Sequence, residues 1–187
     1  MSGFIPEITT IVSVTVKDEN LNEAINLMES SDVLNACFSD VYEDLKSRKE
    51  ELEKLADPVA LAISENLASH QSQVISTKHK VTGMMMNSVD ITKDGDGQYL
   101  VGNTATTYDG FPYPLTIEFG RKGYTIFPVH AKALHFWTNG EEVFTKKAEI
   151  PPMPPDPFVQ HSIDMTEEKL EEIISEYVGN VMSISTK

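Results

Sequence analysis

Residues with chemically active side chains gather in one stretch, FPVHAKALHFWTNGEEVF, which covers positions 127–144. It holds two of the five histidines, His130 and His135, close to the only tryptophan, and it includes the acidic pair Glu141-Glu142. An imidazole beside a carboxylate is a pairing that general acid–base catalysis uses, and histidines are also common zinc ligands. The residue types in this stretch therefore suit a catalytic or metal site.

The spacing of the histidines argues against a local metal site. His130 and His135 are five residues apart, and an odd spacing on one strand sends the two rings to opposite faces. His70 and His79 are nine apart on a predicted helix and are again roughly opposed, while His161 has no neighbouring Cys or His. Since a metal would need residues from distant segments to converge, the sequence predicts no metal ligand.

Other patterns that resemble functional motifs fit ordinary turns and packed helices better than functional sites. The stretch DITKDGDGQYLV resembles a calcium loop, but Val101 stands at its twelfth position, where the loop needs a bidentate carboxylate. Cys37 falls on the apolar stripe of a predicted helix, where a thiol packs. There is no GxSxG elbow, and no predicted helix follows the glycines of FGRKGY to hold a phosphate. We expect no catalytic residue and no cofactor.

The composition favours a single acidic globular domain. The chain has 187 residues, of which 40% are hydrophobic and 24% charged, enough for one core. No apolar run has transmembrane length, and MSGFIPEITT lacks the basic flank and apolar block of a signal peptide. A single cysteine indicates a reducing compartment. The net charge of −14 repels DNA and anionic membranes, so nucleic-acid and membrane binding are disfavoured.

Hydrophobic periodicity predicts a strand and then helices at the start of the chain. The β-branched run at 8–16 predicts the strand, and Asn20 is placed to cap the next helix. Ser31 or Asp32 is predicted to start a second helix, whose apolar stripe contains Leu34, Cys37, Phe38, Val41 and Leu45.

A third helix is predicted from the dipeptide Asp57-Pro58. Aspartate followed by proline is typical of an N-cap and a first helical position. The helix is expected to end before Gly83 and to turn four apolar residues inward, Ala60, Ile63, Leu67 and Val74.

After Gly83 the apolar period changes to two, which predicts antiparallel strands. Strands are expected at 88–91, 98–102, 113–119 and 124–127, with turns at DGDG and GRKG. The run PPMPPDP is predicted to be a stiff extended connector, and Asp156-Pro157 is predicted to open the last helix.

These elements predict an α+β fold with N-terminal helices, an antiparallel β-sheet with hairpins, and a C-terminal helix packed on it. We expect one domain over 1–187, made of a mainly helical part at 1–82, a β part at 83–150 and a proline-led helix at 151–187.

Asn139-Gly140 predicts a hairpin within the opening stretch, because both central residues of a type I′ turn need positive φ. The predicted cross-strand pairs are Phe136 with Val143, His135 with Phe144, and Trp137 with Glu142. One face is then an apolar core face. The other carries His135, Trp137 and Phe144 and also needs cover, either from another subunit or from the terminal helix.

From about residue 81 onward, four short motifs occur in the order of a phage protein family. They are TGMMMNSV (82–89), IEFG (117–120), AKALHFWTNGEEVFTKK (131–147) and PPMPPDPFV (151–159). The chain thereby resembles the tail-component family typified by gene product ten of the lambdoid phage HK-ninety-seven. Met85 stands where the family pattern has an aliphatic residue.

The resemblance implies a minor tail protein of a bacteriophage or prophage that acts in virion assembly. Such proteins form rings in the virion neck, so the implied partners are copies of itself, the head connector or stopper, and the tail tube or tail terminator. DNA would pass only as cargo, no membrane is involved, and the chain would reside in host cytoplasm during assembly. The runner-up is a tail terminator.

Six residues are candidate interface positions under this interpretation: Trp137, Phe144, His135, Glu118, Arg121 and Lys122. Glu118 is expected on a strand, either as a paired interface acid or exposed, and Arg121 and Lys122 at a turn that reaches neighbouring rings. Two other function classes stay open. One is a small hydrolase or metal enzyme using His130, His135 and Glu118, and the other an adaptor that binds SH3-like domains through PPMPP.

Overall fold

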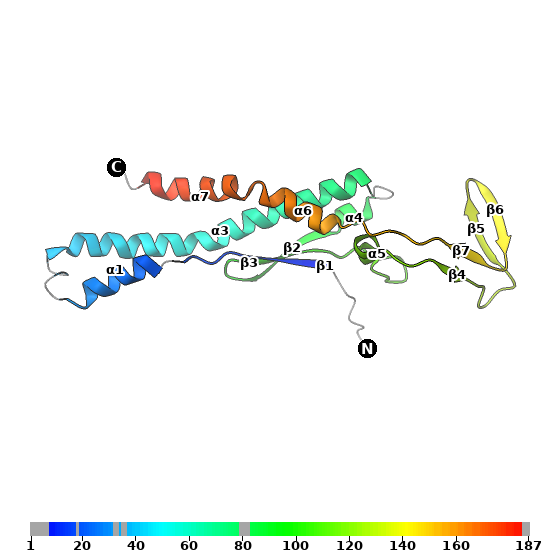
Figure 1. Cartoon of the computed structure of the whole chain (residues 1–187), viewed down its shortest axis with the longest axis horizontal. Helices are drawn as coiled ribbons and strands as arrows, with labels where there is room; N and C mark the ends of the chain where they lie inside the picture. Colours follow the sequence, from blue (N-terminus) through cyan, green and yellow to red (C-terminus); the bar gives the residue numbers. More distant parts are fainter. Residues whose placement is uncertain (1–7, 18, 32–33, 35–36, 79–82, 185–187) are drawn as a thin grey trace.

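The computed structural model describes residues 8–17, 19–31, 34, 37–78 and 83–184. The elements are β1 (Ile8–Ser13), α1 (Glu19–Glu29), α3 (Ser39–Lys78), α4 (Met84–Asn87), β2 (Val89–Gly95), β3 (Gln98–Asn103), α5 (Tyr113–Phe119), β4 (Tyr124–Ile126), β5 (Leu134–Thr138), β6 (Glu141–Thr145), β7 (Ala148–Ile150), α6 (Phe158–Glu167) and α7 (Leu170–Ile184). The predicted α+β class is confirmed. Figure 1 shows an elongated molecule in which helices cover a small sheet and an arm leaves one end.

The body is built around the long helix α3. An antiparallel sheet of order β1-β3-β2 lies against α3, and helices α6 and α7 also pack on α3. The core between them contains Phe158 and Val101, both fully buried, together with Ile75 and Leu67. Each such side chain contributes roughly 1.5–3 kcal/mol by leaving water. The body is therefore held by helix-on-sheet and helix-on-helix packing around one helix.

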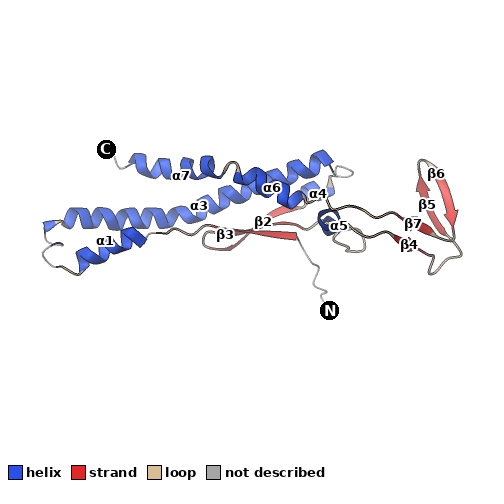
Figure 2. Ribbon diagram, in the orientation of Figure 1, coloured by secondary structure: helices blue, strands red, loops and turns tan. Residues whose placement is uncertain are grey.

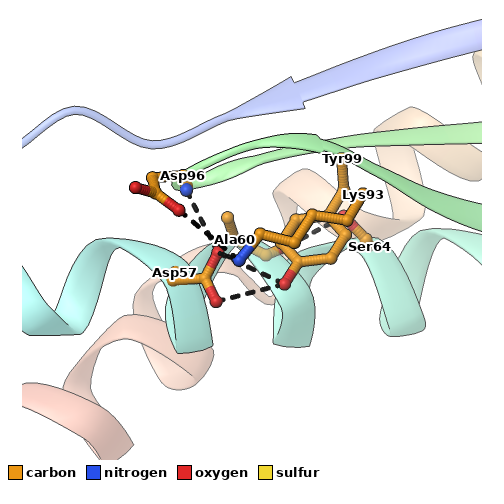
Figure 3. A network of polar contacts seen from close by, with 7 residues as sticks. Asp57, Ala60, Ser64, Lys93, Asp96 and Tyr99 are labelled. Carbon is orange, nitrogen blue, oxygen red and sulfur yellow. Dashed lines mark hydrogen bonds and ion pairs between the residues drawn. The ribbon is translucent and has the colours of Figure 1, made fainter.

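The helix predicted to start at Asp57-Pro58 does not start there, because α3 runs through both residues. The Asp57 carboxylate is used elsewhere. It accepts hydrogen bonds from the Gly97 amide (3.1 Å) and the Tyr99 hydroxyl (3.3 Å) and pairs with Lys93 (2.7 Å), which ties α3 to the β2–β3 hairpin (Figure 3). Pro58 removes one helical hydrogen bond, and these contacts offset that loss.

Two other helix predictions need correction near the N-terminus. Glu19 already belongs to α1, so Asn20 lies inside that helix and does not precede it. The stripe predicted to follow Ser31 is not buried, since Cys37 is exposed, Phe38 is 51% exposed and Val41 47%. Asp32 lies outside the described residues.

The predicted strand at 113–119 is wrong, because these residues form helix α5. Alternation of Leu115 and Ile117 suggested a strand, but Pro114 sits in the first turn, where a helix tolerates a missing N–H. Pro114 and Glu118 are both buried, and their spacing of four places them on one helical face. Tertiary burial of that face overrides the local alternation.

The single closing helix is in fact two helices, α6 and α7, which pack on α3 more than on the sheet. The chain turns between them at Glu168 and Lys169, whose amides donate to the carbonyl oxygens of Asp164 and Thr166. Asp156-Pro157 precedes the first of these helices, as predicted, although the cap residue is Pro157.

Residues 120–155 form an arm that projects from the body (Figures 1 and 2). Its shaft pairs β4 with β7, and its end is the β5–β6 hairpin, here called the tip hairpin. The proline run at 151–157 is extended, as predicted, and lies antiparallel to the outgoing chain. Arg121 and Met153 exchange two backbone hydrogen bonds of 2.9 Å. The arm is therefore braced by both of its chains.

The base of the arm depends on Gly120. Its φ of +69° favours glycine, and a Cβ there would lie 2.6 Å from the Met153 carbonyl oxygen. Gly120→Ala should therefore lower the free energy of unfolding by about 2–4 kcal/mol, from left-handed strain plus a clash with backbone. Gly110→Ala is the control, because Gly110 also has positive φ but open space around it, so about 1 kcal/mol is expected. Equal losses in urea unfolding would show that the close approach is unimportant.

A polar seam between α3 and α6 contains a buried histidine. The Thr166 hydroxyl donates to the Ser162 carbonyl oxygen (2.8 Å), so its oxygen accepts from Nδ1 of His70 (2.9 Å). Burial, and then the charge of Lys169, lower the pKa of His70 from 6.5. The His70 imidazole consequently binds a proton more tightly in the unfolded chain than in the folded chain.

Stability should therefore fall as pH drops through about 6.5, where unfolded histidines become charged. Urea midpoints at several pH values between 8 and 5, taken as free energies, measure this slope. His70→Gln should flatten the slope while lowering stability overall, and His130→Asn, at an exposed position on the arm, should leave it unchanged. An undiminished slope in His70→Gln would contradict this assignment.

Candidate assembly surface

The predicted hairpin and its register are confirmed at the tip of the arm. Asn139 and Gly140 have φ of 50° and 82°, and the three predicted cross-strand pairs are present. Asn139 is the one described non-glycine residue with positive φ. The turn dipeptide thus sets which side chains share a face.

The aromatic face of the tip hairpin is ordered but open to solvent. The rings of His135 and Phe144 stack at 4.6 Å and 6°, and Nε2 of His135 lies 2.8 Å from a Glu142 carboxylate oxygen. Trp137 is 67% exposed and Phe144 65%. Holding aromatic side chains in place before contact reduces the entropy lost on binding.

No residue in the described part of the chain covers either face of the tip hairpin, which corrects the expectation of one core face. Phe136, on the opposite face, is 38% exposed, and Leu134 and Val143 are half-buried. The terminal helix does not cover the aromatic face either, since α6 and α7 pack on α3 in the body (Figure 1). A soluble monomer rarely leaves such contiguous apolar surface open.

Glu118 has a different place from the one predicted. It is a buried helical residue, and its Oε2 accepts a hydrogen bond from the Val159 amide (3.1 Å) at the start of α6. A carboxylate at a helix N-terminus satisfies an amide that has no partner within the helix and interacts favourably with the helix dipole. Burial raises the pKa of Glu118, against the lowering effect of the Val159 amide. Glu118 is thus an internal cap.

Arg121 and Lys122 also lie elsewhere than expected, at the base of the arm and not at a turn tip. The Arg121 guanidinium donates to the Pro151 carbonyl oxygen (3.0 Å) and lies over the Tyr124 ring (5.3 Å), so it braces the shaft. Lys122 is exposed beside it.

The residues proposed for an enzyme do not converge. Glu118 is in α5 at the base of the arm, whereas His135 is in β5 at its end, and His130 is exposed between the shaft and the tip hairpin. Within the described ranges, no three His, Cys, Asp or Glu side chains are grouped so that they could hold a metal ion. His79 lies outside those ranges. The described geometry therefore offers these residues no common pocket.

Charge is divided unequally between the arm and the rest of the chain. The arm holds five of the 15 basic residues and only three of the 29 acidic ones, so its formal charge is +2 and the remainder carries −16. Counting charge along the sequence finds this contrast only once the arm's limits at 120 and 155 are known. Opposite potentials of this kind steer association between surfaces.

Sequence reasoning also missed an apolar groove on the body, which has a volume of about 460 Å³. It is lined by Ile11 and Val12 of β1, Ile63 and Leu67 of α3, Ile163 of α6 and Leu170 of α7. No single segment contains enough of these residues to reveal it. The sequence signal that could have indicated the groove is the amphipathic periodicity of α3 and β1.

Comparison with known proteins leaves the chain without an assigned relative: no protein-family model, curated protein or solved structure matches it. No helix in the described part of the chain has the length and apolar character needed to cross a membrane.

The Glu118 cap generates a prediction about stability. Glu118→Ala should lower the free energy of unfolding by about 1–2 kcal/mol, the usual effect of losing a cap. Glu118→Gln keeps an oxygen that can accept from Val159, so it should lose less than half as much. Chemical denaturation of both variants measures this, and equal losses would mean that the hydrogen bond does not stabilise α6.

Proposed function

We propose that this protein is a structural virion protein of a tailed phage or provirus. Its role is head–tail joining or tail completion, as a ring between the head connector and the tail tube. The observation that carries the proposal is the arm, a braced projection whose tip hairpin presents uncovered aromatic residues on a soluble body. Such a shape serves contact with another molecule better than it serves a reaction.

Three of the four sequence motifs behind the resemblance occupy the parts that build this arm, while the described residues of TGMMMNSV lie in the body, at α4 and the start of β2. IEFG spans the end of α5 and the close approach at Gly120, and the longest motif contains the tip hairpin. PPMPPDPFV contains the returning chain and the start of α6, where Glu118 of the second motif provides the cap. These three motifs are therefore linked physically as well as by order, which supports treating them as one feature.

Ring formation fits the presence of two unlike surfaces on one chain. A closed ring of identical subunits needs a heterologous interface, in which a patch on one copy meets a different patch on the next. The basic arm with its aromatic tip and the acidic body are two such surfaces. The expected partners besides other copies are the connector or stopper and the tail tube or terminator. The net negative charge suits a passage through which DNA slides without sticking.

Substitution of the most exposed aromatic residue of the tip hairpin tests this function. Trp137→Ala should abolish or strongly reduce ring formation while leaving unfolding unchanged, because the side chain is 67% exposed and supports no core. Tyr108→Ala is the matched control, since Tyr108 is a fully exposed aromatic residue outside the arm. Sedimentation and electron microscopy, with the protein alone and with connector and tail proteins, provide the measurement.

Monomers under all of these conditions would overturn the proposal. Deleting the gene for this protein from the virus distinguishes head–tail joining from tail termination. Complete tails that fail to attach to heads indicate a joining protein, whereas tails of irregular length indicate a terminator.

A further inference from the structure

We propose that the tip hairpin of one copy docks in the apolar groove on the body of the next copy. The proposal rests on the ring function above and names the surfaces that the ring would use. It places Trp137 and Phe144 against the groove walls, which include Ile11 and Leu67.

The groove has the properties of a receptor for a β-hairpin. One wall is β1, which stands at the edge of the β1-β3-β2 sheet, so within the described residues its outer edge pairs with no strand. Edge strands offer backbone donors and acceptors to a strand laid beside them. The α6–α7 side contributes the apolar Ile163 and Leu170 together with the polar Thr166 and Glu167. Ile11 is 62% exposed and would lose that exposure on docking.

The tip hairpin has the matching properties. On its aromatic face, the stack of His135 on Phe144 orders these two rings before contact, and Trp137 lies next to them, exposed. Trp is one of the residue types enriched at the energetic centre of protein interfaces, where it fills a desolvated pocket. The groove volume of about 460 Å³ is within the range of pockets that take large apolar groups.

Electrostatics selects the body of another copy as the partner. At the α6–α7 junction beside the groove, the stretch 167–172 has four acidic residues and one basic residue, and Glu167 lines the groove itself. The arm has net positive charge, with Lys132 and Lys146 flanking the tip hairpin. The tip hairpin itself carries two acids, Glu142, which is paired with His135, and Glu141 at the turn, so the positive charge lies beside the hairpin and not on it. Docking therefore brings the lysines that flank the hairpin to an acidic rim, which favours association, whereas two acidic bodies repel each other.

The arm of one copy cannot dock in the groove on its own body. Its base is fixed by the Arg121–Met153 pairing and by the close contact at Gly120, and it extends away from the body (Figure 1). Bending it back would break both. A hairpin on one copy and a groove on another form a heterologous contact, which repeats around a ring.

Cross-linking between differently labelled copies tests the contact. On a Cys37→Ala background, we place one thiol at the end of β5 next to Trp137 (Thr138→Cys) and one in the groove (Ser13→Cys), both at exposed positions. A short thiol-reactive cross-linker should join the two variants when they are mixed under ring-forming conditions. It should not join Thr138→Cys to the control Ser47→Cys, on an exposed polar part of α3. Adding Trp137→Ala should lower the yield about tenfold or more. The yield should also fall as salt rises.

The possible results separate this proposal from the function on which it rests. Rings that form without the Thr138–Ser13 cross-link, or that cross-link Thr138 to Ser47 equally well, overturn the docking and leave the ring function standing. Monomers with every partner present overturn both. A cross-link that appears only after deletion of residues 2–6 shows that the chain's own N-terminal segment occupies the groove, which also overturns the proposal.

Discussion

The arrangement of this protein depends on the junction where the arm leaves the body. There the Glu118 carboxylate accepts a hydrogen bond from the Val159 amide, and the Asp156 amide donates to the Ile117 carbonyl oxygen. Because Gly120 has no Cβ, the returning chain can also pack directly against its backbone. Since α5 and the start of α6 are joined at this point, the direction of the arm is set by the same contacts that start the last helices. A change at the junction would affect both.

The body and the arm, which meet at this junction, are stabilised in different ways. The body is stabilised by burial, with Phe158 fully enclosed against α3, and it also carries nearly all the acidic residues. The arm has little burial of its own and is held by backbone pairing and restricted proline geometry. A projection built this way keeps its shape without a core, and its aromatic residues stay free for contact. The cost is exposed apolar surface, which an isolated chain tolerates only while net charge keeps it soluble.

Polar groups join the elements where apolar packing does not specify the arrangement. Asp57 connects α3 to the β2–β3 hairpin, and the Lys93 ammonium, followed by the Gly97 amide, lowers its pKa. His70 and Thr166 join α3 to α6. Apolar contacts alone allow neighbouring helices to slide, whereas hydrogen bonds at these points specify one alignment.

The sequence by itself determined the local structures that depend on backbone conformation: the Asn139-Gly140 turn with its register, the Asp96-Gly97 turn and the extended proline run. Positive φ and missing amides act within a few residues, so these features can be read from a short segment. Only the tertiary structure decided that 113–119 is helical, that α3 continues through Pro58, and that Glu118 caps α6. In each of these cases a partner distant in sequence, such as Gly97 or Val159, supplies the stabilising contact, and no local pattern records it.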